Sequence, residues 1–410
     1  MEYWKKAAIV AGIGSWSDTM DVILVVSMWP FVLKEFGVTG ALVGVMMSLG
    51  RIGLFLHVPI SGPLIDRFGR KKMWCVGQGL NALAYLLFAL SPTWWVYSIG
   101  DIICSWSFNM ASSSAIFLVE EAPAESRGWV QGLASALSFV GALNASLAMT
   151  LSGLFGFGWR PIMFYNFFFN IVVVILGALV LREPLVWVER KKLIEEGKLK
   201  EAKVPLRELL RPDLRTKILI LLWFNFFAAW AYVADWYRTI YLTGTLKWDM
   251  AMIGVATLIV TPIGAIVGSL LFGRLSDKIG RLKTILISTI CVTITVAFWS
   301  HTHILVGVGL VPAVLLFALI FQILWRIVFV GLGPPSAVWR AELFPTGIRA
   351  TAGSFAMLTR AIFDVISTMA IAILMTVFSL GDLLTVASAL GIVAVLPALA
   401  AKLETKGAKL

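Results

Sequence analysis

The sequence predicts an all-α membrane protein, with twelve transmembrane helices arranged as two pseudo-symmetric six-helix bundles. Three observations lead to this prediction. The composition is too apolar for a water-soluble protein, twelve long apolar segments follow one another along the chain, and two sequence patterns recur in the same order in each half.

The composition favours a lipid bilayer as the solvent of this chain. Hydrophobic residues make up 59% of it and charged residues only 14%, and the mean hydropathy is +0.90. A water-soluble domain of this composition would expose far more apolar surface than its interior could bury. The cysteines Cys75, Cys104 and Cys291 all lie in apolar segments. Neither a disulfide framework nor a metal site is therefore expected, and no cofactor is implied.

The apolar segments have the length of transmembrane helices. A helix needs about 20 mostly apolar residues to cross about 30 Å of hydrocarbon. The first segment lacks a small-residue cleavage pattern, so we expect it to be retained as a helix. The twelve helices are expected at residues 7–34, 40–65, 72–91, 94–119, 128–155, 160–181, 216–243, 250–275, 283–300, 305–339, 350–377 and 381–401.

The basic residues lie in alternate loops, and their placement predicts the orientation. One set of loops contains most of them, including the stretches 182–217 and 274–283. The opposite set contains little more than Lys34, Arg160 and Lys247. By the positive-inside rule the first set is cytoplasmic, which predicts a multi-pass protein of the cell membrane with both termini cytoplasmic. The net charge of +11 is thus a signal of topology, and no nucleic-acid partner is expected.

A polar segment divides the twelve helices six plus six. Residues 182–215 are rich in Lys, Arg and Glu, and the stretch ERKKLIEEGKLKEA within them has helical periodicity. We therefore expect an N-terminal bundle at 1–181, a cytoplasmic linker with helical segments at 182–215, and a C-terminal bundle at 216–410.

Two motifs occur once in each half. The pattern G-x-L-x-D-[RK]-x-G-R begins at Gly62 and again at Gly273, and the pattern E-x-x-P-x-x-x-R begins at Glu120 and again at Glu342. Their nearly equal offsets indicate duplicated halves. We expect their residues to form a conformational gate on the cytoplasmic face; simple anchoring of the topology by loop charges is the alternative. The gate residues are Gly62, Asp66, Arg70, Glu120, Arg127, Gly273, Asp277, Arg281, Glu342 and Arg349.

These motifs resemble the signature of the major facilitator superfamily, and the duplicated E-x-x-P-x-x-x-R resembles its sugar-porter-like branch. The stretches 183–187 and 196–202 are similar to the segment that follows the sixth helix in that branch. The sequence S-D-T-M-D at 17–21 resembles the D-G-x-D motif of aromatic-acid:proton symporters, without its glycine. The resemblance implies a metabolite:proton symporter that works by alternating access around a central site.

Asp18 and Asp21 are the predicted proton-binding pair. An ionisable residue in the bilayer costs roughly 3 kcal/mol on insertion scales, so such residues often mark ion or substrate pathways. Three residues apart, the two acids share one helix face, and in low dielectric both cannot readily ionise together. The alternative is a structural pair neutralised by Arg51. Asp364, in the eleventh helix, is also included among the expected proton-coupling residues.

Asp101 departs from the family pattern, which in most proton-coupled members has an arginine near the start of the fourth helix. Arg51, in the second helix, is its predicted intramembrane charge partner. A buried pair of this kind can act as a switch or as a static brace, and the sequence leaves both open.

An organic anion is the expected substrate, because the arginine fork suits a carboxylate. Arg326, Arg360 and Arg51 are the candidates to bind it, and related organic-anion carriers resemble the chain in having an arginine early in the eleventh helix. Arg360 could instead satisfy Asp364, four residues away. If Arg51 and Arg360 are paired with acids, the anion prediction loses its main support.

The seventh helix adds aromatic and acidic candidates. In the family fold this helix lines the central cavity, so the resemblance makes Trp230, Tyr232 and Asp235 candidate substrate contacts. Core packing of the two aromatic residues is the alternative.

The predicted function is proton-coupled symport of a small organic anion, such as an aromatic or sugar acid. Alternatives are a proton-coupled carrier of neutral sugars or organic cations, an efflux antiporter, and, more remotely, a non-transporting receptor. The expected partners are the substrate, protons and the lipid bilayer, and the protein is expected to be a monomer. No cytoplasmic nucleophile, base and orienting group come together, so an enzyme is not expected.

Overall fold

The computed structural model describes residues 2–56, 61–111, 127–196, 211–304, 311–344 and 349–405. Within these ranges the backbone alone is described at some positions, including Asp66, Arg127 and Arg349. The chain divides into two compact units. The first contains residues 1–38, 49–203 and 250–255, and the second contains 39–48, 204–249 and 256–410.

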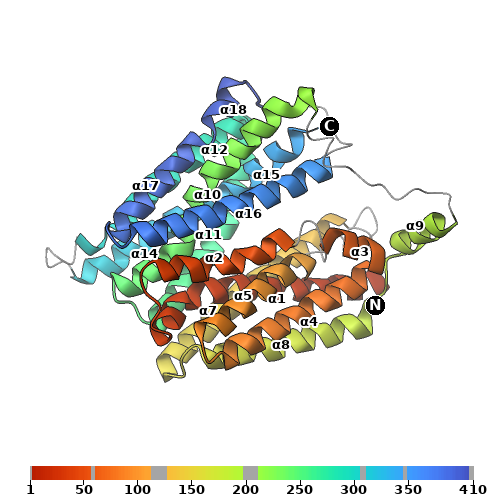
Figure 1. Cartoon of the computed structure of the whole chain (residues 1–410), viewed down its shortest axis with the longest axis horizontal. Helices are drawn as coiled ribbons and strands as arrows, with labels where there is room; N and C mark the ends of the chain where they lie inside the picture. Colours follow the sequence, from red (N-terminus) through yellow and green to blue (C-terminus); the bar gives the residue numbers. More distant parts are fainter. Residues whose placement is uncertain are drawn as a thin grey trace. The chain divides into compact units, whose positions relative to one another are not determined.

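The first unit is a bundle of long helices (Figure 1). Its helices are α1 (Tyr3–Glu35), α2 (Ala41–Leu56), α3 (Gly62–Phe68), α4 (Arg70–Leu90), α5 (Trp94–Ala111), α7 (Arg127–Phe155), α8 (Arg160–Val180) and α9 (Leu185–Glu195). Of α2, the part from Leu49 onward belongs to this unit. Helix α1 packs against α7 and α8, and α4 packs against α5 and α8. Glycines permit the closest approach: the Trp74 ring of α4 lies against Gly14 of α1 and Gly177 of α8.

The second unit repeats this plan. Its helices are α10 (Arg215–Gly244, preceded by the 3₁₀ turn Pro212–Leu214), α11 (Met250–Ile279, from Ala256 on), α12 (Arg281–Ser300), α14 (Val311–Gly331), α15 (Gly333–Glu342), α16 (Arg349–Leu374), α17 (Leu380–Val393) and α18 (Leu396–Ala400). Helix α10 packs against α16 and α17, and α12 packs against α14 and α17. Leu221, Phe224, Leu282 and Trp339 belong to their common core.

Ten helices in the described part of the chain are long and apolar enough to cross a membrane. They correspond to ten of the twelve predicted segments. The other two, 40–65 and 94–119, are described only over part of their length, as α2 with α3 and as α5. The predicted helix 305–339 is interrupted at Leu332 before two prolines, and 381–401 is interrupted before Pro397. Proline causes both breaks, since its ring clashes with the preceding turn.

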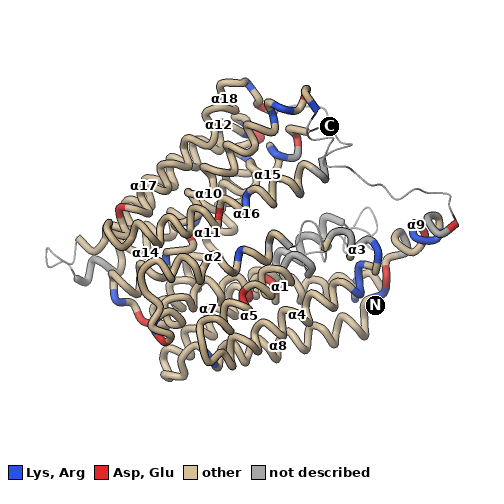
Figure 2. The backbone as a smooth tube through the Cα atoms, in the orientation of Figure 1, with Lys and Arg blue, Asp and Glu red and all other residues tan. Residues whose placement is uncertain are grey.

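The outer surfaces of the units are apolar. Leu154, Leu179 and Val377 are more than two-thirds exposed, which is stable only where lipid replaces water. Figure 2 shows that Lys, Arg, Asp and Glu gather mainly at helix ends in each unit, with a few inside the helices. Those few interior charges are the candidates for ion and substrate binding.

Candidate functional site

The acid pair lies on α1 in the interior of the first unit. Asp18 is 7% exposed and Asp21 is 1% exposed. Gln78 Nε2 of α4 donates to Asp18 Oδ1 at 3.1 Å. The Asp21 carboxylate meets more donors, which come from the side-chain amides of Asn81, Asn166 and Asn170. Two buried carboxylates are therefore solvated by neutral amide groups.

A second layer of hydrogen bonds holds these amides. Ser107 of α5 donates to Asn81 Oδ1, and Ser17 donates to Asn170 Oδ1 at 2.9 Å. Asn170 Nδ2 also donates to the Asn166 carbonyl, one turn earlier on α8, at 3.0 Å. Four helices, α1, α4, α5 and α8, thus fix the position of the pair.

No cation of the described residues forms an ion pair with Asp18 or Asp21. Two buried amide oxygens beside them, Gln78 Oε1 and Asn166 Oδ1, accept no hydrogen bond from the described residues. A buried ionised carboxylate without a counterion is costly, and a protonated one supplies an O–H donor. The site is chemically suited to holding a proton.

Arg51 lies beside Asp101 and not beside the acid pair. Its charge acts on the Asp101 carboxylate, which is buried on α5. The same carboxylate lies directly against Gly50 of α2, where a Cβ atom would leave it no room. The predicted charge partnership of Asp101 is thus present, while neutralisation of Asp18 and Asp21 by Arg51 is not what the structure shows.

Both arginines predicted to bind an anion in the C-terminal half are paired with acids. Arg326 Nη1 of α14 lies 2.7 Å from Asp235 Oδ1 of α10. Arg360 Nε lies 2.8 Å from Asp364 Oδ1, one turn away on α16. The anion prediction was expected to lose its main support if Arg51 and Arg360 were paired with acids. Arg360 is paired with Asp364, and Arg51 has Asp101 as its neighbour. Arg326 and Arg360 therefore each have a carboxylate partner in this conformation.

The aromatic candidates of α10 have partners of their own. The Arg360 guanidinium lies over the Tyr232 ring, 4.0 Å from its centroid, and the Tyr232 ring meets Phe329 edge-on. The Trp230 ring meets Phe226 edge-on. Asp364, which is bonded to Arg360, likewise has no freedom in this conformation to act as a proton carrier without first releasing that arginine.

A buried arginine that was not among the predicted site residues lies near the pair formed by Arg326 and Asp235. Arg238 of α10 is 6% exposed. Its Nη1 lies 3.5 Å from Gln322 Oε1, and its Nη2 lies 3.3 Å from Thr257 Oγ1. Its charged neighbours are Asp235, which attracts it, and Arg326, which repels it. Asp235 is thus shared by two arginines.

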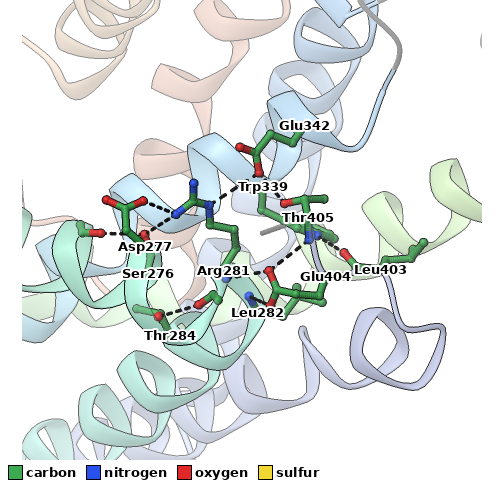
Figure 3. A network of polar contacts seen from close by, with 12 residues as sticks. Ser276, Asp277, Arg281, Leu282, Thr284, Trp339, Glu342, Leu403, Glu404 and Thr405 are labelled. Carbon is green, nitrogen blue, oxygen red and sulfur yellow. Dashed lines mark hydrogen bonds and ion pairs between the residues drawn. The ribbon is translucent and has the colours of Figure 1, made fainter. Parts of the chain in front are cut away.

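The second copy of the gate motif forms a polar network at the end of the second unit that bears the basic loops (Figure 3). Arg281 binds Asp277 and Ser276 through Nη1, and its Nε lies 3.6 Å from Glu342 Oε2. Thr405 also donates to Glu342. Arg281 of the first duplicated motif thus pairs with Glu342 of the second; the role of these residues as a gate stays a prediction.

Glu404 caps helix α12 in the same network. Its carboxylate accepts from the backbone N–H groups of Arg281 and Leu282, at 2.8 and 3.0 Å. Backbone N–H groups at a helix N-terminus have no acceptor within the helix, and a negative charge is favourable there. Gly280, with φ of +107°, precedes the helix, and a Cβ atom there would press on the Glu404 carboxylate.

The first unit contains the equivalent cap. Glu183 accepts from the backbone N–H groups of Lys71 and Lys72, both at 3.1 Å, at the start of α4. Gly69, with φ of +109°, takes the place of Gly280. Of the remaining predicted gate residues in this half, Arg70 is buried and Gly62 is the first residue of α3. Glu120 lies outside the described residues, as do the side chains of Asp66 and Arg127 and, in the other half, that of Arg349.

Several residues of these sites do not follow from reading charges alone. Gln78 and Asn81, and likewise Asn166 and Asn170, are polar pairs at helical spacing inside apolar segments, and that spacing is a readable signal for a buried polar face. Glu183 and Glu404 lie 221 residues apart, close to the 222 that separate the two E-x-x-P motifs. A third internal repeat signal was therefore present in the sequence.

Comparison with known proteins decides the family. A family model described as Major Facilitator Superfamily matches residues 11–368. The chain belongs to the major facilitator superfamily. It is thus an all-helical, multi-pass membrane transporter and not an enzyme, as predicted.

The chain is related to sugar:proton symporters at low identity. It is 25% identical over 385 residues to the arabinose-proton symporter of Bacillus subtilis, covering 84% of this transporter and 80% of the relative. It is 29% identical over 174 residues to a D-xylose transporter of Levilactobacillus brevis, covering 42% of this chain and 37% of the relative. It is also 24% identical over 271 residues to multidrug resistance protein 2 of Bacillus subtilis, covering 65% of this chain and 66% of the relative.

Solved structures have the same fold. A crystal structure of a D-xylose-proton symporter superposes with a TM-score of 0.75 at 17% identity, covering 96% of this transporter and 97% of the other chain. A nucleoside transporter superposes with a TM-score of 0.73 at 14% identity, covering 96% and 99% of the two chains. The predicted major facilitator fold is confirmed.

Proposed function

We propose that this transporter is a proton-coupled symporter of a small organic anion that works by alternating access. The observation that carries the proton coupling is the buried pair Asp18 and Asp21, which amides solvate and no described cation neutralises. The expected orientation, with both termini in the cytoplasm of the cell, belongs to the same proposal.

The proton step would occur on the pair as a unit. Asp21 accepts three amide N–H donors and Asp18 accepts one. Hydrogen bonds from such donors stabilise the ionised form of a carboxylate. In the proposed cycle Asp18 would therefore hold the proton and Asp21 the negative charge, and a change in the packing of α1 against α4 and α8 would redistribute both.

An anionic substrate is supported by the charges of the second unit. Among the described residues, two acids, Asp235 and Asp364, face the three arginines Arg238, Arg326 and Arg360. A positive excess in the interior favours a ligand that brings a negative charge. In the proposed cycle, protons compensate the acids of one half while the substrate compensates the arginines of the other. The metabolite:proton branch suggested by the S-D-T-M-D motif agrees with this.

A neutral sugar is the second candidate substrate. The relatives with assigned substrates include an arabinose-proton symporter, and the pairing of Arg326 and Arg360 with acids removes two of the predicted anion contacts. The polar side chains of α10 and α14 would then bind hydroxyl groups.

The first experiment reconstitutes the protein in liposomes that contain a pH-sensitive dye. Glucuronate, benzoate, xylose, arabinose and an organic amine are added in turn to the wild type and to Asp18→Asn and Asp21→Asn. We expect one class of substrate to drive proton entry in the wild type. Both variants should lose proton movement, since an amide cannot carry a proton as a carboxyl group does, yet retain substrate exchange between the two sides.

Asp382→Asn is the control, because Asp382 is an exposed acid at the start of α17, bonded to His301. Its proton flux should equal that of the wild type. Unchanged proton flux in both helix-1 variants would show that the pair is structural and that coupling lies elsewhere.

A further inference from the structure

The hydrogen bonds that are missing around Arg238 are all of one kind. Arg238 Nε, Gln322 Nε2 and Arg326 Nε are buried donors that reach no acceptor among the described residues. The Gln322 amide cannot be reversed to change this, because its Oε1 faces Arg238. These three groups could all bind one additional acceptor. The unsatisfied amide oxygens beside Asp18 and Asp21 could instead bind an additional donor.

Helix geometry brings these donors together. Asp235 and Arg238 are three residues apart on α10, and Gln322 and Arg326 are four apart on α14, so each pair occupies one helix face. Helix α11 provides the third wall: Thr257 bonds Arg238. About two turns further along the same face of α11, Gly264 leaves room for the Arg326 side chain, since a Cβ atom there would collide with its Cγ.

The charges of the cluster do not balance. Two guanidinium groups share the single carboxylate of Asp235, and Arg326 already binds that carboxylate at 2.7 Å. Arg238 is 6% exposed and Gln322 is fully buried, so bulk water does not compensate the second charge. Burial of a positive charge without full compensation is costly, and an anionic ligand would relieve that cost.

We infer that Arg238, Gln322 and Arg326 form the binding site for the carboxylate group of the substrate, with Asp235 holding Arg326 in place. This inference rests on the proposed function and sharpens it, because it moves the anion from Arg360 and Arg51 to a cluster centred on Arg238. The ligand class is a small organic carboxylate. Its two oxygens would accept from the Arg238 Nε–H and the Gln322 amide, the donors that have no other acceptor.

Gln322→Glu is the most direct test. The change is almost isosteric and supplies the missing negative charge permanently, so Arg238 gains a partner and a carboxylate ligand is repelled. In the purified full-length protein we expect an unchanged or higher melting temperature together with carboxylate binding weakened roughly thirtyfold or more by isothermal titration calorimetry. Arg238→Gln should lose binding to a similar degree through loss of the cation.

Arg160→Gln is the matched control for Arg238→Gln. Arg160 is also an arginine of a transmembrane unit, but it binds Glu35 at the opposite half of the chain, and its removal should leave binding unchanged. The probes are glucuronate and benzoate, with xylose as the neutral probe and chloride and phosphate as inorganic anions.

The outcomes separate this inference from the proposed function. Wild-type affinity in Gln322→Glu, or equal affinity for chloride or phosphate, would overturn the carboxylate site. Binding of xylose alone would also overturn it, while proton coupling measured through Asp18 and Asp21 would still stand. Carboxylate binding that depends on Arg238 and Gln322 but drives no proton flux would support the site and reject the coupling.

Discussion

At the scale of single residues, the interior charges of this transporter differ in how they are compensated. Asp18 and Asp21 are compensated by amides, Arg360 by Asp364, and Asp101 by the nearby charge of Arg51. A carboxylate solvated by amides can gain or lose a proton without breaking an ion pair. A paired one must first release its arginine, which makes such pairs suited to bracing or to switching.

The Arg51 and Asp101 neighbours provide a test of brace against switch. Arg51→Gln and Asp101→Asn should each lower the free energy of unfolding by about 3 kcal/mol, because each leaves an uncompensated buried charge. The double variant should lose less free energy of unfolding than the two single variants lose in total, as measured by denaturation of the detergent-solubilised protein.

The transport rate of the double variant then separates the two roles. A stable double variant that transports normally indicates a brace, and one that is stable but inactive indicates a switch. Strict additivity of the two losses would show that the residues do not act on each other.

At the scale of elements, the two halves repeat a helix cap as well as a motif. The carboxylates of Glu183 and Glu404 each receive two backbone N–H groups at the start of α4 and α12. In both places a glycine with positive φ precedes the helix. The cap fixes the end of one helix to the segment that follows the last helix of the same half.

Loss of either cap should destabilise its own half. Glu404→Ala should lower the free energy of unfolding by about 1 to 2 kcal/mol, because two helix N–H donors lose a charged acceptor. Glu404→Gln should lose less, since its amide oxygen still accepts. Thermal denaturation of the purified variants measures both, and Glu189→Ala, an exposed acid of α9, is the control. A melting temperature equal to that of the wild type would mean that water replaces the carboxylate at no cost.

Helix positions follow from apolar length and were predictable, whereas side-chain partners on different helices were not. The sequence shows that Asp235 and Arg326 are charged and intramembrane, but they are 91 residues apart in the chain, and only the tertiary arrangement of the second unit brings them to 2.7 Å. The pair Arg360 and Asp364 was predictable because it lies within one helical turn. Arg238 was visible as a charge, but that it is the arginine left without a carboxylate of its own depends on three helices at once.

At the scale of the whole molecule, the distribution of basic loops predicts a topology that labelling can check. In a chain whose three native cysteines are replaced by serine, Thr245→Cys should react with a membrane-impermeant maleimide in intact cells. Lys192→Cys should react only after permeabilisation, because its loop belongs to the basic set. Both positions are exposed, so reactivity reports the side of the membrane.

The cysteine-free chain without an added cysteine is the background control. The reverse pattern of labelling would invert the orientation and place the Glu183 and Glu404 caps at the outer face.

The position of the caps also has a consequence for biosynthesis. Helix α4 begins at Arg70, but the acid that caps it is residue 183, and α12 begins at Arg281 with its cap at residue 404. During translation more than 100 residues must therefore be added after the start of each of these helices before its capping glutamate is available. The N-terminal half can complete its cap while the C-terminal half is still on the ribosome. The C-terminal half can complete its own cap only after Glu404 has been synthesised, so a nascent chain stalled before Glu404 would present an open helix end to the quality-control machinery of the membrane.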